Sequence, residues 1–368
     1  MKEKTYLSLG ATAIQPRCSY KDNTGERTDR RIQTFIIPDF FVVSDLGLEK
    51  FSFGLGESTY WGLGTYWAED SFSKYVATKS DYTTDDVMFA GAYAVNENIS
   101  IGVAADYTNS YVNKKKKLSQ QTWGGADADF QLKGSDKNAW GYRLSTLYKV
   151  NKKHSFGLMY RSPVDVKYKG KLYLDGLNGV YASQAYFAGA SYETEVTSKT
   201  TLPQSIVLGY CYKPTDKLRL EFDTEWMDWS SIEEEKIDYP SETNATRLSV
   251  LNAGNPVPKD WHSAFAYAIG AEYKVSDTLR LRTGYLFHKT PIPQSTFETS
   301  IPDASSNTVT LGAGIDLNKN FTIDIAYAAM FYNKRKINNN VGSLSGVNIN
   351  GEYDTFINIC VLTLTFKL

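Results

Sequence analysis

One hairpin, Pro203–Trp229, constrains the fold of this chain more than any other stretch. On both sides of its turn, apolar side chains alternate with polar or small ones, and the apolar positions are Ile206, Leu208, Tyr210, Tyr212, Leu218, Leu220 and Phe222. A period of two is typical of strands with one apolar and one polar face. Because the link Lys213–Lys217 is short and rich in turn formers, the two strands are predicted to be antiparallel neighbours.

The same design recurs along the chain. In each copy a tyrosine precedes a polar turn and a new alternating run follows it; the copies are Tyr93–Ile99, Tyr148–His154, Tyr212–Leu218 and Tyr273–Leu279. A fifth turn, Leu317–Phe321, is shorter. A repeated hairpin predicts a meander of antiparallel strands.

Alternation and turn signals predict about fourteen strands. The first is expected at Thr5–Tyr20, the second at Ile32–Ser44 and the last at Tyr353–Leu368. The third begins near Lys50 and loses its pattern in the glycine- and aromatic-rich stretch Glu57–Trp67. Long connections are expected at Gly170–Ser198, Glu233–Asp260 and His288–Asp303, and Lys114–Lys117 is expected in a loop.

The connections alternate in length between about 3–6 and roughly 10–30 residues, so short turns would lie at one end of the sheet and long loops at the other. An even number of long strands with this asymmetry is typical of a bacterial outer-membrane β-barrel. The final strand agrees, since an apolar face reaches the C-terminus, where closure would leave no unpaired edge in lipid. The sequence therefore predicts an all-β transmembrane barrel whose turn tyrosines lie in an interfacial girdle.

Composition excludes several other classes. No stretch approaches 18 consecutive apolar residues, which excludes a transmembrane helix. The net charge of −1 gives no reason to expect a nucleic-acid partner. Cys18, Cys211 and Cys360 are far apart, and the three histidines are scattered, so we expect no disulfide framework, metal site or cofactor.

Several short stretches resemble the outer-membrane long-chain fatty acid and hydrocarbon transporters, the FadL/TodX-like family. Those that carry the resemblance are Phe53–Gly56, Gly157–Ser162, Leu202–Ser205, Trp226–Ser230, Gly270–Tyr273, Leu281–Tyr285, Pro291–Pro293, Ile301–Asp303 and Leu311–Gly314. The resemblance implies a monomeric fourteen-stranded barrel in the outer membrane, plugged by an N-terminal hatch with an Asn-Pro-Ala motif. The predicted first strand begins almost at Met1 and no Asn-Pro-Ala occurs, so we expect one barrel domain over residues 1–368, without the hatch.

A lipid-like solute needs a concave, mostly apolar site with a few polar groups. Candidates for its apolar part are Tyr60, Trp61, Tyr66 and Trp67 after the third strand, and Tyr181, Tyr186, Phe187 and Tyr192 in a long connection. The alternative is that these aromatic residues pack against one another or lie in the membrane interface.

Three arginines fall on the interior parity of their strands: Arg161, Arg280 and Arg282. Each could orient a carboxylate head group by bidentate hydrogen bonds, and Arg161 is the first candidate. The alternative is a structural ion pair with interior carboxylates such as Asp223, Glu225 or Asp324.

Gly54, Gly56, Gly62 and Gly64 bracket the irregular end of the third strand, where glycines indicate a bend or a plain turn. The resemblance implies a kink there that opens the barrel wall towards lipid. Lys114–Lys117 is interpreted as a solvated loop, with contact to anionic lipopolysaccharide as the alternative.

No nucleophile–base pair, phosphate-binding loop or metal motif is evident, so no catalytic residue is assigned. The function expected is outer-membrane transport of hydrophobic compounds such as long-chain fatty acids or aromatic hydrocarbons. A general diffusion porin or a structural barrel is the alternative, and an outer-membrane lipase is a more distant one.

Overall fold

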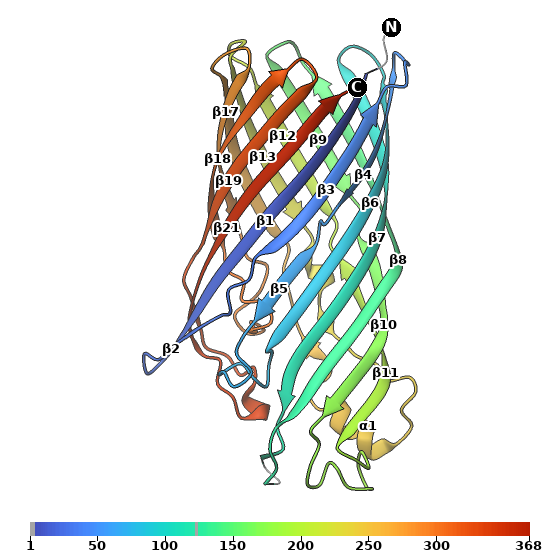
Figure 1. The fold of residues 1–368 in the computed structure, drawn as a ribbon, viewed down its shortest axis with the longest axis vertical. Coiled ribbons are helices and arrows are strands. Elements are labelled where there is room, and N and C mark those ends of the chain that lie inside the picture. The colour runs from blue at the N-terminus through green and yellow to red at the C-terminus, as the bar shows by residue number, and fades with distance from the viewer. Residues whose placement is uncertain (1–3, 122–123) are drawn as a thin grey trace.

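The chain folds into a closed antiparallel β-barrel of 14 strands, described by a computed structural model for residues 4–121 and 124–368 (Figure 1). Three barrel strands are each interrupted into two segments. In chain order the strands are β1 (Thr5–Asp22), β3 (Phe35–Ser44), β4 (Phe51–Ser58) with β5 (Gly62–Tyr66), β6 (Lys79–Ala94), β7 (Ile99–Leu118), β8 (Ala128–Lys149), β9 (His154–Arg161) with β10 (Val164–Asp175), β11 (Ser191–Leu202) with β12 (Ser205–Tyr212), β13 (Leu218–Met227), β16 (Ala264–Lys274), β17 (Leu279–His288), β18 (Ser306–Asn318), β19 (Phe321–Tyr332) and β21 (Gly351–Lys367). Pairing of β21 with β1, from Tyr6↔Lys367 to Asp22↔Gly351, closes the barrel and leaves no free edge there. The predicted fold class is confirmed.

All the short turns lie at one end of the barrel, with the start of β1 and the end of β21 (Figure 1). This end, the turn rim, holds the predicted turns near Asn96, Asn151, Pro214, Ser276 and Lys319. The long connections gather at the other end, the loop end. The alternation of short and long connections is therefore real, and it is typical of outer-membrane barrels.

The outward faces of the strands carry large apolar side chains. On β8, Trp140, Tyr142, Leu144 and Tyr148 are 54%, 48%, 49% and 45% exposed. Soluble proteins rarely leave a band of such side chains in water, whereas a lipid-facing surface requires one. Tyr148 and Tyr273, beside their turns, are both exposed at the edge of this band, as a girdle position requires.

Two predicted boundaries were wrong. Lys114–Lys117 lies inside β7 rather than in a loop, because all four residues pair with β8 and the first two also pair with β6. A run of charged residues does not end a strand that projects beyond the bilayer. Even-numbered residues of this part of β7 point into the barrel, so Lys114 faces the interior and Lys115 is exposed. The connection expected at Gly170–Ser198 is shorter, since β10 extends to Asp175 and β11 begins at Ser191.

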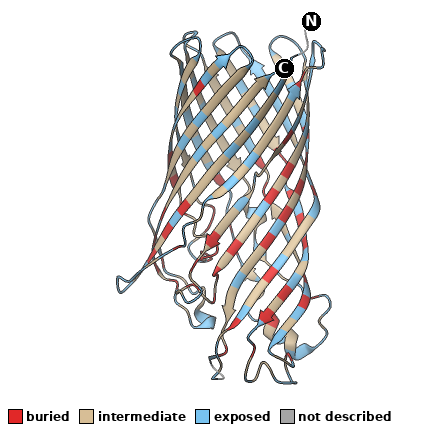
Figure 2. Ribbon diagram, viewed as in Figure 1, coloured by how far each residue is buried: buried red, intermediate tan, exposed pale blue. Residues whose placement is uncertain are grey.

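Buried residues concentrate at the loop end, whereas the turn half is mostly intermediate or exposed (Figure 2). One buried cluster joins β7, β8, β10 and β11 to the connections around Phe187, Tyr239 and Leu251. A second joins β1 and β21 to Trp67, Trp261 and Phe297. The long connections thus fold inward and pack inside the barrel.

These connections hold only short elements: β2 (Arg27–Asp29), η2 (Trp229–Ser231), β14 (Glu234–Glu235), α1 (Ala245–Leu251), β15 (Val257–Pro258), β20 (Arg335–Ile337) and η3 (Ser343–Ser345). Helix α1 begins after Asn244, whose side chain accepts the amide N–H groups of Thr246 and Arg247. Among the described residues, no helix is long and apolar enough to cross a membrane.

Candidate binding site

The third barrel strand is interrupted at residues 59–61. β4 pairs with both β3 and β6, whereas β5 pairs with β6 alone. Two side chains of β6 hold the interruption: Asp86 accepts the amide N–H of Tyr60 (3.1 Å), and Thr84 accepts that of Trp61 (3.1 Å). Asp86 and Thr84 are themselves buried and joined by a 2.7 Å hydrogen bond, so Tyr60 and Trp61 are anchored on a rigid strand.

The four predicted glycines flank this interruption, with Gly54 and Gly56 in β4 and Gly62 and Gly64 in β5. A Cβ atom on Gly56 would overlap the ring of Phe41, and one on Gly64 would overlap the ring of Phe35. Gly54 and Gly62 have more room, with no atom closer than 3.6 Å to a Cβ built on either. Two of the four are therefore needed where an aromatic ring crosses the strand.

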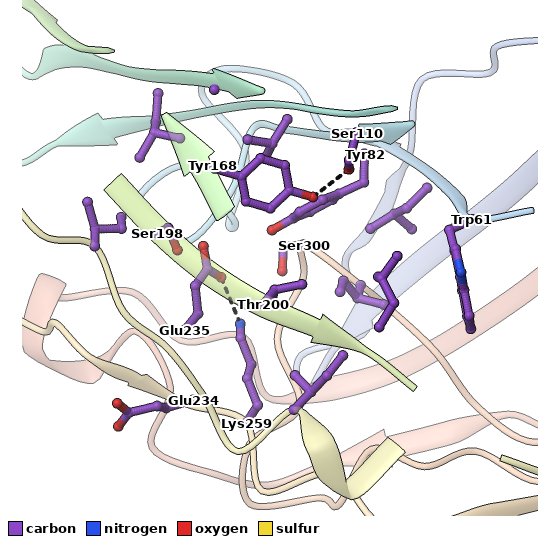
Figure 3. A pocket seen from close by; sticks show the side chains of 18 of the residues that line it. Trp61, Tyr82, Ser110, Tyr168, Ser198, Thr200, Glu234, Glu235, Lys259 and Ser300 are labelled. Carbon is purple, nitrogen blue, oxygen red and sulfur yellow. Dashed lines mark hydrogen bonds and ion pairs between the residues drawn. The ribbon is translucent and has the colours of Figure 1, made fainter. Parts of the chain in front are cut away.

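An apolar cavity of about 240 Å³ lies inside the loop end of the barrel, against Trp61 (Figure 3). Its aromatic lining is Trp61, Tyr82, Tyr168, Trp229 and Trp261, and its aliphatic lining is Leu63, Val112, Leu132, Val196, Leu202, Ile232, Ile237 and Ile301. The hydroxyl groups of Tyr168 and Ser110 are hydrogen-bonded to each other at 2.7 Å, so that polar pair is satisfied. A dry cavity of roughly 150 Å³ is enough to hold benzene, so this one accommodates a larger hydrophobic body.

One end of the cavity carries charge, in a group of four side chains that we term the ion group: Lys114, Glu235, Lys259 and Glu298. The Lys259 ammonium lies 3.4 Å from Glu235 and also pairs with Glu298, and Lys114 pairs with Glu235 from β7. Only 5% of the Lys259 side chain is exposed. Burial alone would raise the pKa of Glu235, but the ammonium groups of Lys114 and Lys259 outweigh it and lower that pKa to about 2.

A second polar cluster surrounds Arg161, which is 1% exposed and points inward as predicted. Its guanidinium carbon lies 3.4 Å from the centre of the Tyr60 ring, and its Nε is 3.9 Å from Asp106. Asp106 is hydrogen-bonded to Arg143 at 2.8 Å, and none of the three Arg161 nitrogens makes a hydrogen bond to the described residues. Tyr60 therefore covers Arg161, which is not among the residues that line the cavity.

The other predicted site residues lie elsewhere. Trp67 is 1% exposed in the second buried cluster, where its indole N–H donates to the carbonyl of Thr299 at 3.0 Å. Tyr66 is hydrogen-bonded to Asp81 beside β5. Tyr181, Tyr186, Phe187 and Tyr192 contact one another, in agreement with the packing alternative.

Arg280 and Arg282 are near the turn rim, far along their strand from the loop end. Arg280 forms a bidentate pair with Asp316, and Arg282 pairs with Glu272 and Asp324. These carboxylates occupy the guanidinium N–H donors that a substrate carboxylate would need. Both arginines therefore agree with the alternative of a structural ion pair. The interior carboxylates predicted as partners do not include the one paired with Arg161, which is Asp106 rather than Asp223 or Glu225.

A second cavity, of about 750 Å³, lies between β3 and β5, where the two strands do not pair. It is bounded by Ile36 and Pro38 of β3, by Tyr60 and Tyr66, and by Asp303 from a long connection. Four residues line both cavities: Gly62, Leu63, Tyr82 and Ile301. A thin wall of these side chains therefore separates the internal cavity from the gap in the barrel wall.

The ion group was missed from the sequence. Lys114 and Glu235 are separated by 121 residues, so no local pattern indicates their pairing. Alternation along β7 could have placed Lys114 on the interior face with Val112, had the strand been extended through the lysine run. Trp229 was noted only as the end of the hairpin Pro203–Trp229 and within the stretch Trp226–Ser230, and Trp261 was not singled out.

Comparison with known proteins decides the family. The family described as "Outer membrane protein transport protein (OMPP1/FadL/TodX)" matches residues 1–368. The chain belongs to this family. Its members are outer-membrane proteins, and the chain is accordingly an outer-membrane β-barrel.

Individual relatives are distant. The long-chain fatty acid transport protein of Escherichia coli O157:H7 is 21% identical over 92% of this chain and 81% of its own length. A crystal structure of a Pseudomonas aeruginosa FadL homologue has a TM-score of 0.82 at 18% identity, covering 99% of this chain and 90% of that one. The Pseudomonas putida toluene transporter TodX has a TM-score of 0.71 at 16% identity, with the same coverage. At these identities the two structures show the shared fold.

Proposed function

We propose that the chain binds hydrophobic solutes in the internal cavity and passes them sideways, through the gap between β3 and β5, towards the membrane. The observation that carries this proposal is the wall shared by the two cavities at Gly62, Leu63, Tyr82 and Ile301. The wall is narrow, and its residues come from the interrupted strand, from β6 and from a connection, so small side-chain movements join the two spaces. The names of the relatives, fatty acid transport protein and toluene transporter, supply the solute classes to test.

The role of the Gly54–Gly64 segment as a gate is part of this proposal. A gap forms where the third barrel strand stops pairing with β3. The interruption after Ser58 is the point at which this pairing stops. Tyr60 and Trp61 occupy different cavities, since Tyr60 lines the gap and Trp61 lines the internal cavity. A movement of this short segment therefore acts on both spaces at once.

Two glycine variants test the sideways route. A Cβ on Gly62 has only Thr59 nearby, at 3.7 Å, so a side chain can start from this position, and Gly62→Phe would place its ring at the shared wall. Gly157 lines the lumen near the turn rim, in a space of about 520 Å³, and a Cβ there meets no atom within 4 Å. Uptake of toluene by cells producing each full-length variant should fall for Gly62→Phe and stay unchanged for Gly157→Phe. The reverse result would indicate an axial path through the lumen, as in a diffusion porin.

Further proposals concern partners and chemistry. We expect a monomer, because closure of β21 on β1 leaves no strand edge for a second chain. Lys115 is the exposed member of the Lys114–Lys117 run that contact with lipopolysaccharide would use. We expect no catalysis, since the family consists of transport proteins.

A further inference from the structure

We propose that the internal cavity accepts uncharged hydrophobic solutes and rejects anionic ones, and that Glu235 and Glu298 set this selection. The inference rests on the proposed function, since it names the class of solute for the same cavity. It is argued from the charges that line the cavity, their pairing and their burial.

The charged groups that face this end of the cavity are paired with one another. Among the described residues, the charged side chains at the cavity are Glu234, Glu235, Glu298 and Lys259. Glu234 is exposed and points away from the interior, while Glu235 and Lys259 face each other across the end of the cavity (Figure 3). One lysine is thus shared between two inward carboxylates, and Lys114 supports Glu235 from β7.

The Lys259 ammonium is already paired with two carboxylates, with which a solute carboxylate would have to compete. Lys259 is bonded to Glu298 and lies 3.4 Å from Glu235, so an incoming anion would have to displace one of them. Displacement would leave Glu298 buried without its cation, or Glu235 with Lys114 alone, and a buried carboxylate that loses its partner is strongly unfavourable. The hydroxyl group of Ser300 already donates to Glu298 at 2.5 Å, so this neighbour is also engaged.

Both glutamates remain charged in the folded protein. Burial would raise the pKa of Glu298, but Lys259 outweighs it and lowers that pKa, and the pKa of Glu235 is lowered to about 2. Neither carboxyl can therefore offer a proton to an anionic solute at neutral pH. An anion that enters this apolar space would lose its hydration, and the lysines of the ion group are already paired with Glu235 and Glu298.

Among the described residues that line the cavity, Lys259 is the one cation, while Lys114 and Lys116 face the same interior from β7. Lys116, two residues along β7 from Lys114, has its ammonium 5.1 Å from the centre of the Phe130 ring and is not part of the lining. Arg161 lies under Tyr60, with its guanidinium carbon 5.6 Å from the Trp61 ring centre. A neutral aromatic or aliphatic solute needs no such cation, because five aromatic side chains line the space.

Toluene and benzoate test the selection, since the two differ by a methyl group in place of a carboxylate. Full-length protein in lipid nanodiscs would be titrated with each, using the fluorescence of Trp61, Trp229 and Trp261 as readout and empty nanodiscs as blank. We expect toluene to bind at least about tenfold more tightly than benzoate, a difference of about 1.4 kcal/mol. Equal affinities would overturn the selection and leave the proposed function standing, whereas no binding of toluene would contradict both.

Two isosteric variants identify the residues responsible. Glu235→Gln and Glu298→Gln each release the lysine, so each should raise benzoate affinity at least about tenfold and change toluene affinity less than about threefold. Glu193→Gln, which removes the partner of Lys171 on the exposed face of β11, is the matched control and should change neither. Unchanged benzoate binding in both folded cavity variants would overturn the assignment to Glu235 and Glu298. If one variant fails to fold, the other and the wild-type comparison still decide the matter.

Discussion

At the residue scale, Arg161 is either a ligand for an anionic head group or a structural residue, and the two roles predict different binding results. A head-group ligand would make carboxylate binding depend on Arg161, whereas a side chain that holds Tyr60 and Trp61 in place would affect all solutes alike. Since Tyr60 covers Arg161 and the cavity carries its own acids, we expect the second result. Arg161→Met should lower the free energy of unfolding by about 2 kcal/mol, the value of a desolvated cation–π contact.

Thermal unfolding and the affinities of decanoate and decane, each measured for Arg161→Met, would check this prediction. Arg280→Met near the turn rim is the control for loss of an interior guanidinium distant from the cavity. A loss of decanoate affinity without a matching loss for decane would contradict the structural role and restore the head-group hypothesis.

The need for glycine at position 56 can be tested by adding a single methyl group. Gly56→Ala would force the Phe41 ring to move, and overpacking of this kind costs roughly 1–3 kcal/mol. Gly91→Ala on β6 meets no atom within 4 Å and should be nearly neutral. Unfolding of both variants in guanidinium chloride measures the difference, and equal stability would show that Phe41 does not need Gly56.

At the scale of elements, the ion group fastens two long connections to the barrel. Lys259 and Glu298 come from different connections, and Lys114 ties both to β7 through Glu235. Because the folded pKa of Glu235 is about 2 and its ordinary value is 4.5, the unfolded or undocked state takes up a proton first as the pH falls. Docking of the connections is therefore fully stabilised above pH 4.5 and loses roughly 3 kcal/mol as the pH falls towards 2.

Amide hydrogen exchange around Glu235 and Glu298 at pH 6 and pH 3 would measure this loss, after correction for intrinsic rates. Glu235→Gln should remove most of the pH dependence in these connections and leave β13 and β16 protected. Identical protection at both pH values in the unmodified protein would contradict the stabilising role of the ion group.

The sequence predicts elements whose patterns are local and misses those whose contacts are distant. Alternation revealed the hairpin at Lys213–Lys217 and the strand count, because each strand displays its own lipid-facing side. Trp61 was expected after the third strand and lies in its interruption, and its position in the cavity wall depends on Thr84 of β6 and on Trp229, whose ring centre lies 5.4 Å away. Lys114 was misplaced because lysine runs are usually solvated, and only Glu235, 121 residues later, makes an interior position stable.

At the scale of the whole molecule, the barrel separates two kinds of surface. Its turn half faces lipid, with exposed apolar side chains outside, and its loop end projects further and packs inward around the cavity (Figure 2). The third barrel strand joins these regions, since β4 pairs on both sides and β5 on one. This division places a hydrophobic cavity beside a gap in the wall, an arrangement that a water-filled diffusion pore does not require.

Selective uptake tests this account most directly. Gram-negative cells producing the full-length chain would be compared with cells carrying an empty vector for uptake of labelled toluene and labelled glucose. The account predicts that the chain raises toluene uptake several-fold and leaves glucose uptake at the level of the control. Equal stimulation of both solutes would contradict it and would identify the chain as a general diffusion porin.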